Sequence, residues 1–325
     1  MFRPLFNRLS PAGAHALLSV LVFHRVLPRP DPLFPTAMHA RRFDAVCGWL
    51  ARWFNVLALD EAVARLKAGT LPARAASISF DDGYADNHQV ALPILQRHGL
   101  SATFFIATSF LDGGRMWNDS LIESIRACKL PLLDLSALGL GLHRLDTLPE
   151  RRSAVTALIT QIKYRPLPVR VRLTEQLSAL ARVALPHDLM LTSPAVKALR
   201  QAGMQIGAHT VSHPILAGLP DEQARQEISG SQQFLETLLG ERVSLFAYPN
   251  GKPGEDYTPH TVDIVRSLGF EAAVSTQWGA SGGGDDLLQL KRFTPWDQTR
   301  LRFGLRMLSN LKNADSRGFD PQDKS

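Results

Sequence analysis

The sequence alternates between short, strongly apolar runs and longer segments whose apolar residues recur at helical spacing. This alternation constrains the fold more than any other feature, because strands separated by helices of about 10 to 15 residues are typical of βα units and a parallel sheet. The predicted strands cover residues 17–23, 55–59, 76–80, 102–107, 204–208, 243–248, 271–275 and 288–293. About seven or eight such units that close on themselves make a barrel rather than an open sheet.

The alternation stops in the middle of the chain. Helical patterns at 121–128, 150–162 and 171–182 fill this stretch, and within it only 130–135 has the character of a strand. We therefore predict a helical insertion in an α/β barrel. The predicted organisation is an N-terminal extension at 1–16, a barrel at 17–295 with the insertion at about 112–191, and a C-terminal helix with a polar tail at 296–325.

The charge balance excludes few functions but argues against nucleic acid as a partner. Lys and Arg number 36 against 30 Asp and Glu, which gives a net charge of +6. The basic residues are spread along the chain without a long run, as expected for a solvated basic surface. The two cysteines, Cys47 and Cys128, are too few for a disulfide framework or a cysteine-based zinc site.

No apolar run reaches the roughly 18 residues that a membrane-spanning helix needs. The N-terminal apolar segment at 12–23 ends at His24 without a small-residue cleavage pattern, so we predict a buried strand rather than a signal peptide. The expected location is cytoplasmic or peripheral to the inner membrane. Phe2, Leu5 and Phe6 lie in a basic stretch at 1–8, which leaves a peripheral membrane contact through the N-terminus open.

Two adjacent carboxylates, Asp81 and Asp82, follow the predicted strand at 76–80 and precede Gly83. Burying neighbouring carboxylates costs several kcal/mol unless a cation or hydrogen bonds compensate. A metal ion would let one carboxylate act as ligand while the other stays free for proton transfer. An ordinary Asp-Asp-Gly turn is the alternative reading of this stretch.

Two histidines, His209 and His213, follow the strand predicted at 204–208. Pro214 disfavours helical geometry at His213, so a loop turn is expected there. Neutral imidazole is the commonest metal ligand in proteins. Together with a carboxylate after another strand, two histidines leave coordination positions open, as in a catalytic metal site.

A third stretch, Tyr248-Pro249-Asn250, begins at the last residue of the strand predicted at 243–248. It is placed to form a wall of the same site and to supply a backbone N–H. A simple Pro-Asn-Gly turn accounts for the stretch equally well.

Taken in order, FDDG at 80–83 and HTVSHP at 209–214 resemble the polysaccharide deacetylases of the NodB type, carbohydrate esterase family four. The resemblance extends over about residues 20 to 293. It implies a distorted (β/α)7-type barrel, the NodB homology domain, and metal-dependent N-deacetylation. By this resemblance Asp82, His209 and His213 would bind the metal, zinc or another divalent ion such as Co2+, Ni2+ or Mn2+. Asp81 would be the general base, and the Tyr248 N–H would help to stabilise the oxyanion.

The chain departs from the commonest family pattern at two places. No histidine lies beyond His260, where that pattern has its acid, and no arginine precedes Tyr248 in the third motif. A circularly permuted subgroup that includes the poly-N-acetylglucosamine deacetylases has its acid histidine at the N-terminal end of the barrel. By resemblance to that layout His24 would be the general acid. Arg292, after the last predicted strand, is the proposed replacement for the missing arginine.

The resemblance predicts a hydrolase that removes N-acetyl groups from an N-acetylated polysaccharide, oligosaccharide or glycan precursor, in exopolysaccharide or cell-envelope glycan metabolism. Two alternatives stay open. The same site could act on another C–N amide or on an O-acetyl ester, or the chain could be a non-catalytic carbohydrate-binding protein with this barrel. Intact Asp81, Asp82, His209 and His213 argue against the second alternative, because a binding protein has no need of a free base beside a metal.

Overall fold

The computed structural model describes residues 2–315, and the rest of the predicted polar tail lies outside this range. The chain divides into two compact units. The barrel unit comprises Met1–Arg29, Met38–Leu111 and Leu191–Ser325, and the helical unit comprises Pro30–Ala37 and Asp112–Met190.

Seven parallel strands close into a barrel in the order β1, β3, β4, β7, β8, β9, β10, because β1 pairs with both β10 and β3. These strands are β1 (Leu18–Phe23), β3 (Ala75–Phe80), β4 (Thr103–Ile106), β7 (Gln205–Ala208), β8 (Leu245–Ala247), β9 (Ala272–Trp278) and β10 (Leu290–Phe293). The short β2 (Asn55–Val56) pairs only with the start of β3. The predicted distorted (β/α)7 barrel is thus confirmed.

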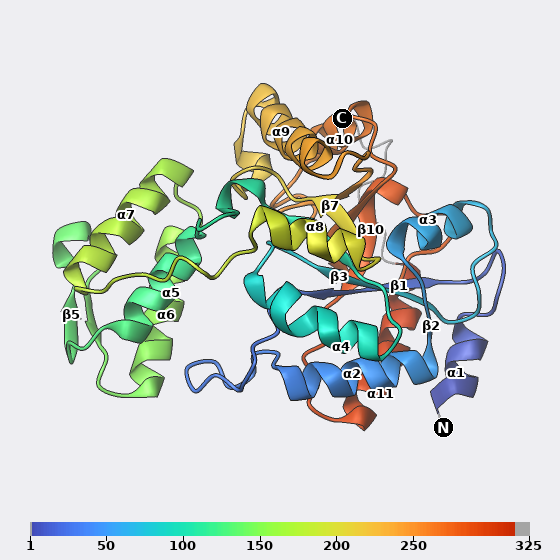
Figure 1. Ribbon diagram of the computed structural model, residues 1–325, viewed down its shortest axis with the longest axis horizontal. Helices are drawn as coiled ribbons and strands as arrows, with labels where there is room; N and C mark the ends of the chain where they lie inside the picture. Colours follow the sequence, from blue (N-terminus) through green and yellow to red (C-terminus); the bar gives the residue numbers. More distant parts are fainter. Residues whose placement is uncertain (1, 316–325) are drawn as a thin grey trace. The chain divides into compact units, whose positions relative to one another are not determined.

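Helices lie outside the strands of the barrel unit (Figure 1). They are α1 (Phe2–Leu9), α2 (Ala40–Trp53), α3 (Leu59–Lys67), α4 (Leu92–Arg97), α8 (Ser193–Gln201), α9 (Asp221–Leu239), α10 (Pro259–Ser267) and α11 (Arg300–Lys312). Gly240 ends α9 in a left-handed conformation, which glycine adopts without a steric penalty. A π-helical turn, Asn87–Ala91, comes directly before α4.

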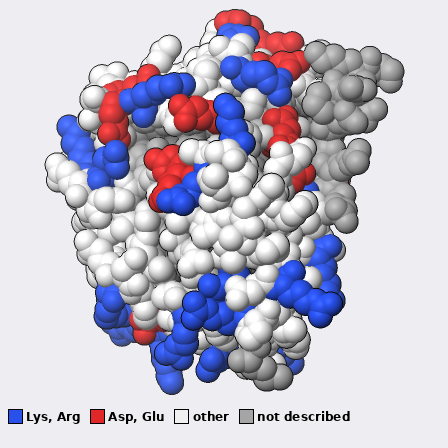
Figure 2. Space-filling model, turned by 90° about the vertical axis from the view of Figure 1, so that its right-hand side faces the viewer, with Lys and Arg blue, Asp and Glu red and all other residues white. Residues whose placement is uncertain are grey.

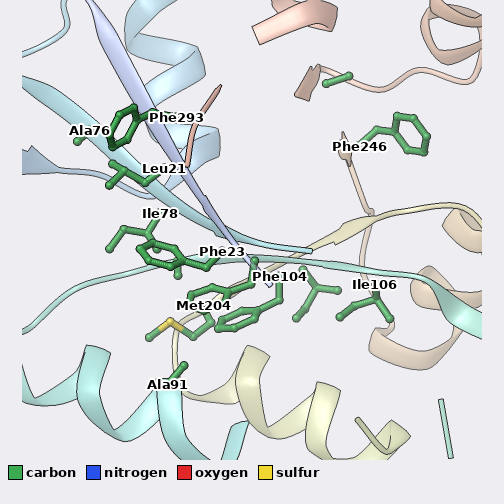
Figure 3. Close-up of a cluster of buried hydrophobic side chains, with 14 of the residues drawn as sticks. Leu21, Phe23, Ala76, Ile78, Ala91, Phe104, Ile106, Met204, Phe246 and Phe293 are labelled. Atoms are coloured by element: carbon green, nitrogen blue, oxygen red, sulfur yellow. The ribbon is translucent and has the colours of Figure 1, made fainter. Parts of the chain in front are cut away.

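Every residue of β1 and β3 is buried, because one side of each strand faces the barrel interior and the other faces helices. Aromatic rings form the centre of the core between strands and helices. Phe80 lies 5.3 Å from Phe23 and 4.8 Å from Phe104 between ring centroids, and Phe43 of α2 meets Phe80 edge-on. Figure 3 shows the rings of Phe23 and Phe104 within this cluster.

The helical unit has its own core and no strand of the barrel. Its elements are α5 (Trp117–Ala127), α6 (Leu148–Ile162), α7 (Leu167–Leu180) and the antiparallel pair β5 (Leu132–Asp134) and β6 (Leu142–Arg144). Buried Leu121, Leu158 and Leu177 bring its three helices together. Within the part of the chain that the structure describes, no helix of either unit has the length and apolarity to cross a bilayer.

Candidate metal centre

Three side chains from two strand ends converge on one point. Asp82 follows β3, and His209 and His213 follow β7. The Asp82 Oδ1 atom lies 3.4 Å from the Nε2 atom of each histidine, and the possible ligand atoms of all three residues lie within 4.8 Å of one another. Asp82 Oδ1 is buried and has no hydrogen-bond partner among the described residues. A carboxylate with two imidazoles is a donor set that suits Zn2+ and similar divalent ions, so these residues fit the metal that the sequence predicts.

The backbone that carries this trio is held in uncommon conformations. Asp82, Thr210 and His213 have φ angles of +77°, +66° and +53°. Non-glycine residues adopt this left-handed region rarely, and each instance costs on the order of 1–3 kcal/mol. No helix forms between 209 and 215, in agreement with the loop turn predicted from Pro214. Such conformations persist only where surrounding contacts stabilise them, and they cluster at functional sites. The strain at these three positions therefore supports a functional role for the two loops.

Hydrogen bonding fixes the orientation of the His209 ring. Its Nδ1 atom lies 2.7 Å from the carbonyl oxygen of Ala247, at the end of β8, and His209 is 1% exposed. An Nδ1–H donated to this carbonyl leaves the Nε2 lone pair directed at Asp82, where a cation would sit. Burial lowers the pKa of His213 to about 4, which favours the neutral ring that a metal requires.

Arg292 and Asp81 form a buried ion pair beside the trio. The Arg292 Nη1 atom donates to Asp81 Oδ1 at 2.7 Å, and its Nε donates to the Ser275 carbonyl at 2.7 Å. Burial by itself raises the pKa of Asp81, but the guanidinium outweighs it and holds that pKa below its ordinary value. Asp81 is therefore ionised at neutral pH, as a general base must be.

An irregularity in the sheet allows Arg292 to reach its partners. Leu290 pairs with Val274, whereas Arg292, two residues further along β10, pairs with Trp278, four residues further along β9. This bulge leaves the Ser275 carbonyl available to accept from the Arg292 Nε. The sequence shows no sign of the bulge, because neither glycine nor proline marks it.

His24 is exposed at the end of β1, next to Asp81 on the neighbouring strand. The Asp81 N–H donates to the Phe23 carbonyl at 2.9 Å, and Asn87 Nδ2 donates to the His24 carbonyl at 2.8 Å. Asp86 accepts from the Val26 N–H at 2.8 Å and from the Arg25 side chain at 2.8 Å. The loop that carries His24 is therefore fastened to the chain that follows Asp82.

Burial raises the pKa of Asp82, but the interaction with the His209 ring, together with the charges of His213 and His24, outweighs burial and lowers it. The charge of His24 likewise contributes to the lowered pKa of Asp81. The structure thus brings five predicted residues to one end of the barrel: His24, Asp81, Asp82, His209 and His213.

Comparison with known proteins identifies the family of the chain. Residues 68–128 and 155–273 match the family model described as polysaccharide deacetylase. The chain belongs to the polysaccharide deacetylase family. It is 21% identical to YxkH of Bacillus subtilis (strain 168) over 279 residues, which cover 85% of this chain and 71% of that protein.

Solved structures of deacetylases share the fold. Streptococcus pyogenes deacetylase PplD, in complex with acetate, superimposes with a TM-score of 0.61 at 18% identity, over 91% of this chain and 98% of PplD. IcaB from Ammonifex degensii gives a TM-score of 0.59 at 18% identity, over 93% of this chain and 98% of IcaB. At 18% identity these two similarities establish the fold of this polysaccharide deacetylase.

Tyr248 does not lie as expected in this family member. Its backbone N–H donates to the Val274 carbonyl at 3.2 Å, as part of the barrel sheet, and is not available to an oxyanion in this conformation. Its ring is buried, stacks on Tyr257 at 3.9 Å, and its hydroxyl donates to the Leu288 carbonyl at 2.9 Å. Pro249 and Asn250 follow it at the strand end, and Asn250 has a φ angle of +57°.

Glu227 is a site residue that the sequence does not reveal. It lies on α9 and accepts from the Val211 N–H at 3.0 Å, from the Ser212 N–H at 2.8 Å and from the Ser212 hydroxyl at 2.5 Å. These three hydrogen bonds hold the turn between His209 and His213. Glu227 resembles any charged residue of an amphipathic helix, and no motif separates it from its neighbours.

Proposed function

We propose that this chain is a metal-dependent hydrolase that removes N-acetyl groups from an N-acetylated polysaccharide or glycan precursor, in exopolysaccharide or cell-envelope glycan metabolism. One observation carries the proposal: the Asp82–His209–His213 trio lies beside a second carboxylate, Asp81, that Arg292 keeps ionised. A site built only to hold a metal needs no such carboxylate. Membership of the polysaccharide deacetylase family supports the same reaction class.

Asp82, His209 and His213 would hold the metal, with zinc as the first choice and Co2+, Ni2+ or Mn2+ as alternatives for the same donors. When bound, such an ion lowers the pKa of a water and polarises the acetamide carbonyl. Asp81 takes the proton from the water as its oxygen attacks the carbonyl carbon. Arg292 keeps Asp81 ionised and fixes its position through the 2.7 Å hydrogen bond.

Breaking the C–N bond releases acetate and requires a proton on the departing nitrogen. His24 would donate it, and the position of His24 supports this role, because it follows β1, which pairs with the strand that leads into Asp81. Its exposure suits a substrate that is a chain rather than a small molecule. Pro249 and Asn250, which follow β8 on the far side of β7, would contact the sugar.

The test uses purified protein with bound-metal analysis and an acetate-release assay on N-acetylglucosamine oligomers. The wild type should bind about one divalent ion per chain and release acetate. Asp82→Asn should lose the metal, whereas Asp81→Asn should keep it and lose turnover. Asp146→Asn, on the surface of the helical unit, is the matched control and should behave as the wild type.

The outcomes separate the alternatives. Metal binding without release of acetate from any amide would favour a carbohydrate-binding protein. Release from O-acetylated but not N-acetylated sugars would make the chain an esterase. Failure to bind divalent metal, or unchanged activity of Asp82→Asn, would overturn the proposal altogether.

A further inference from the structure

The helices near the two ends of the chain, α1 and α11, pack against each other on the barrel unit. The ring of Phe2 on α1 lies directly over Gly304 on α11, so closely that a β-carbon at residue 304 would stand 2.5 Å from it. Phe6 and Phe303 are fully buried beside Trp53. Each helix therefore has one apolar side already covered by the core.

The outward sides of these two helices also carry large apolar residues. Leu5 of α1 is 47% exposed, and Leu301 and Leu305 of α11 are 58% and 53% exposed. Leu301 and Leu305 are one turn apart on α11 and flank Gly304, while Leu5 is one turn from Phe2. Exposed leucines therefore occur on both of the helices that contact each other, at positions where a surface helix usually carries polar residues.

The charged residues of the two helices are all basic, and of these Arg306 lies 3.4 Å from Asp297, which precedes α11. The two helices together contain six basic residues and no acidic one: Arg3, Arg8, Arg300, Arg302, Arg306 and Lys312. Moreover, the first acidic residue of the whole chain is Asp31. Figure 2 shows basic side chains gathered towards the lower end of the face that includes α1, whereas the upper end carries both signs.

We propose that the outward face of α1 and α11 binds an anionic lipid bilayer. Leu5, Leu301 and Leu305 would enter the interface between headgroups and acyl chains, and the surrounding arginines would lie at the level of the lipid phosphates. Exposed leucines with a basic rim and no acidic residue are the composition of a helix that lies in a membrane surface rather than across it.

Other occupants fit this face less well. A second copy of the chain would bring two basic faces together without any acidic residue on α1 or α11 to pair with them. An anionic polymer would satisfy the arginines but would leave the three leucines exposed to water. An anionic bilayer accounts for both features at once. This inference does not depend on the proposed catalytic activity.

The experiment is sedimentation of the full chain with vesicles of phosphatidylcholine alone and of phosphatidylcholine mixed with phosphatidylglycerol, at physiological ionic strength. The wild type should sediment with the mixed vesicles and not with phosphatidylcholine alone. The double variant L301S/L305S should bind the mixed vesicles with an affinity at least about tenfold lower than that of the wild type. Its thermal unfolding and its acetate release from soluble oligosaccharide should equal those of the wild type.

The matched control is L132S/L142S, which removes two leucines of similar exposure, 49% and 61%, from the helical unit. It should bind vesicles as the wild type does. Equal binding by L301S/L305S and the wild type would overturn the proposal, and so would failure of the wild type to bind the mixed vesicles. A wild-type dimer in sedimentation velocity that L301S/L305S dissociates would assign the face to a second copy instead.

Discussion

Arg292 and Asp81 lie 211 residues apart in the sequence, yet they share a hydrogen bond of 2.7 Å inside the barrel. The Arg292 side chain is fully buried and that of Asp81 is 4% exposed. Water can solvate neither charge, so each depends on the other. In this way the barrel uses its last strand to position the carboxylate at the end of an early one.

Replacing Arg292 by Met should destabilise the protein by about 3–5 kcal/mol, because it leaves the Asp81 carboxylate buried without a counter-charge. Urea unfolding, followed by circular dichroism, measures this loss. Arg144→Met is the control: Arg144 pairs with Asp146 and Glu150, but its side chain is 72% exposed. Its loss should leave the midpoint of the urea transition essentially unchanged, because water solvates these charges.

Adding Asp81→Asn to Arg292→Met should restore part of the lost stability, since the second change removes the unpaired charge. The two single changes would then be non-additive. If the loss of unfolding free energy in the double variant equals the sum of the losses in the two single variants, the ion pair contributes little. Arg292 then stabilises the barrel through its hydrogen bond to the Ser275 carbonyl.

Glu227 should control the affinity for metal without touching it. Glu227→Ala removes three hydrogen bonds from the turn that carries His213, whose backbone is held at a φ angle of +53°. The expected result is a 10- to 100-fold weaker affinity for Zn2+, roughly the effect of losing an outer-shell partner. Competition with a chromophoric chelator measures this dissociation constant.

Glu222→Ala changes an exposed residue of the same helix and should leave the affinity as it is. Rescue by Glu227→Gln should be partial, because a glutamine accepts with one oxygen where the carboxylate uses two. An unchanged affinity of Glu227→Ala for Zn2+ would show that the turn between His209 and His213 keeps its conformation without the hydrogen bonds to Glu227.

The sequence is sufficient to predict the barrel and the trio of Asp82, His209 and His213. Short apolar runs identify buried strands, and residues that follow successive parallel strands meet at one end of the sheet. It also singles out Arg292, which the structure brings to Asp81.

The features that the sequence did not disclose depend on contacts between distant segments. Glu227 accepts hydrogen bonds from backbone groups 15 and 16 residues away. Nearly every residue has a backbone N–H, so the sequence does not show which N–H groups a side chain will bind. The N–H of Tyr248 is taken by a sheet hydrogen bond to Val274, and the sequences of β8 and β9 do not show which residues of the two strands pair. The hairpin of β5 and β6 has only one buried side chain, so β6 produced no apolar run.

Cys47 should be unreactive in the native protein. It is fully buried on α2, and burial raises the pKa of its thiol well above the ordinary value, so almost no thiolate exists at neutral pH. Both cysteines are free and buried. Titration with Ellman's reagent should therefore find almost no thiol in the native state and two per chain in guanidinium chloride. Fast native labelling that persists in Cys128→Ser would show that α2 opens readily.

His24→Ala should lower turnover by roughly 100-fold while the metal content stays unchanged, since a general acid contributes on that order and His24 is not among the proposed metal ligands. Acetate release at saturating oligosaccharide gives the turnover, and elemental analysis gives the metal. His260→Ala, an exposed histidine on α10, serves as control and should retain full activity. A substrate whose leaving group needs no proton should restore most of the rate to His24→Ala, which distinguishes an acid from a residue that only shapes the loop. Loss of metal in His24→Ala, or turnover equal to the wild type, would place the acid elsewhere at this end of the barrel.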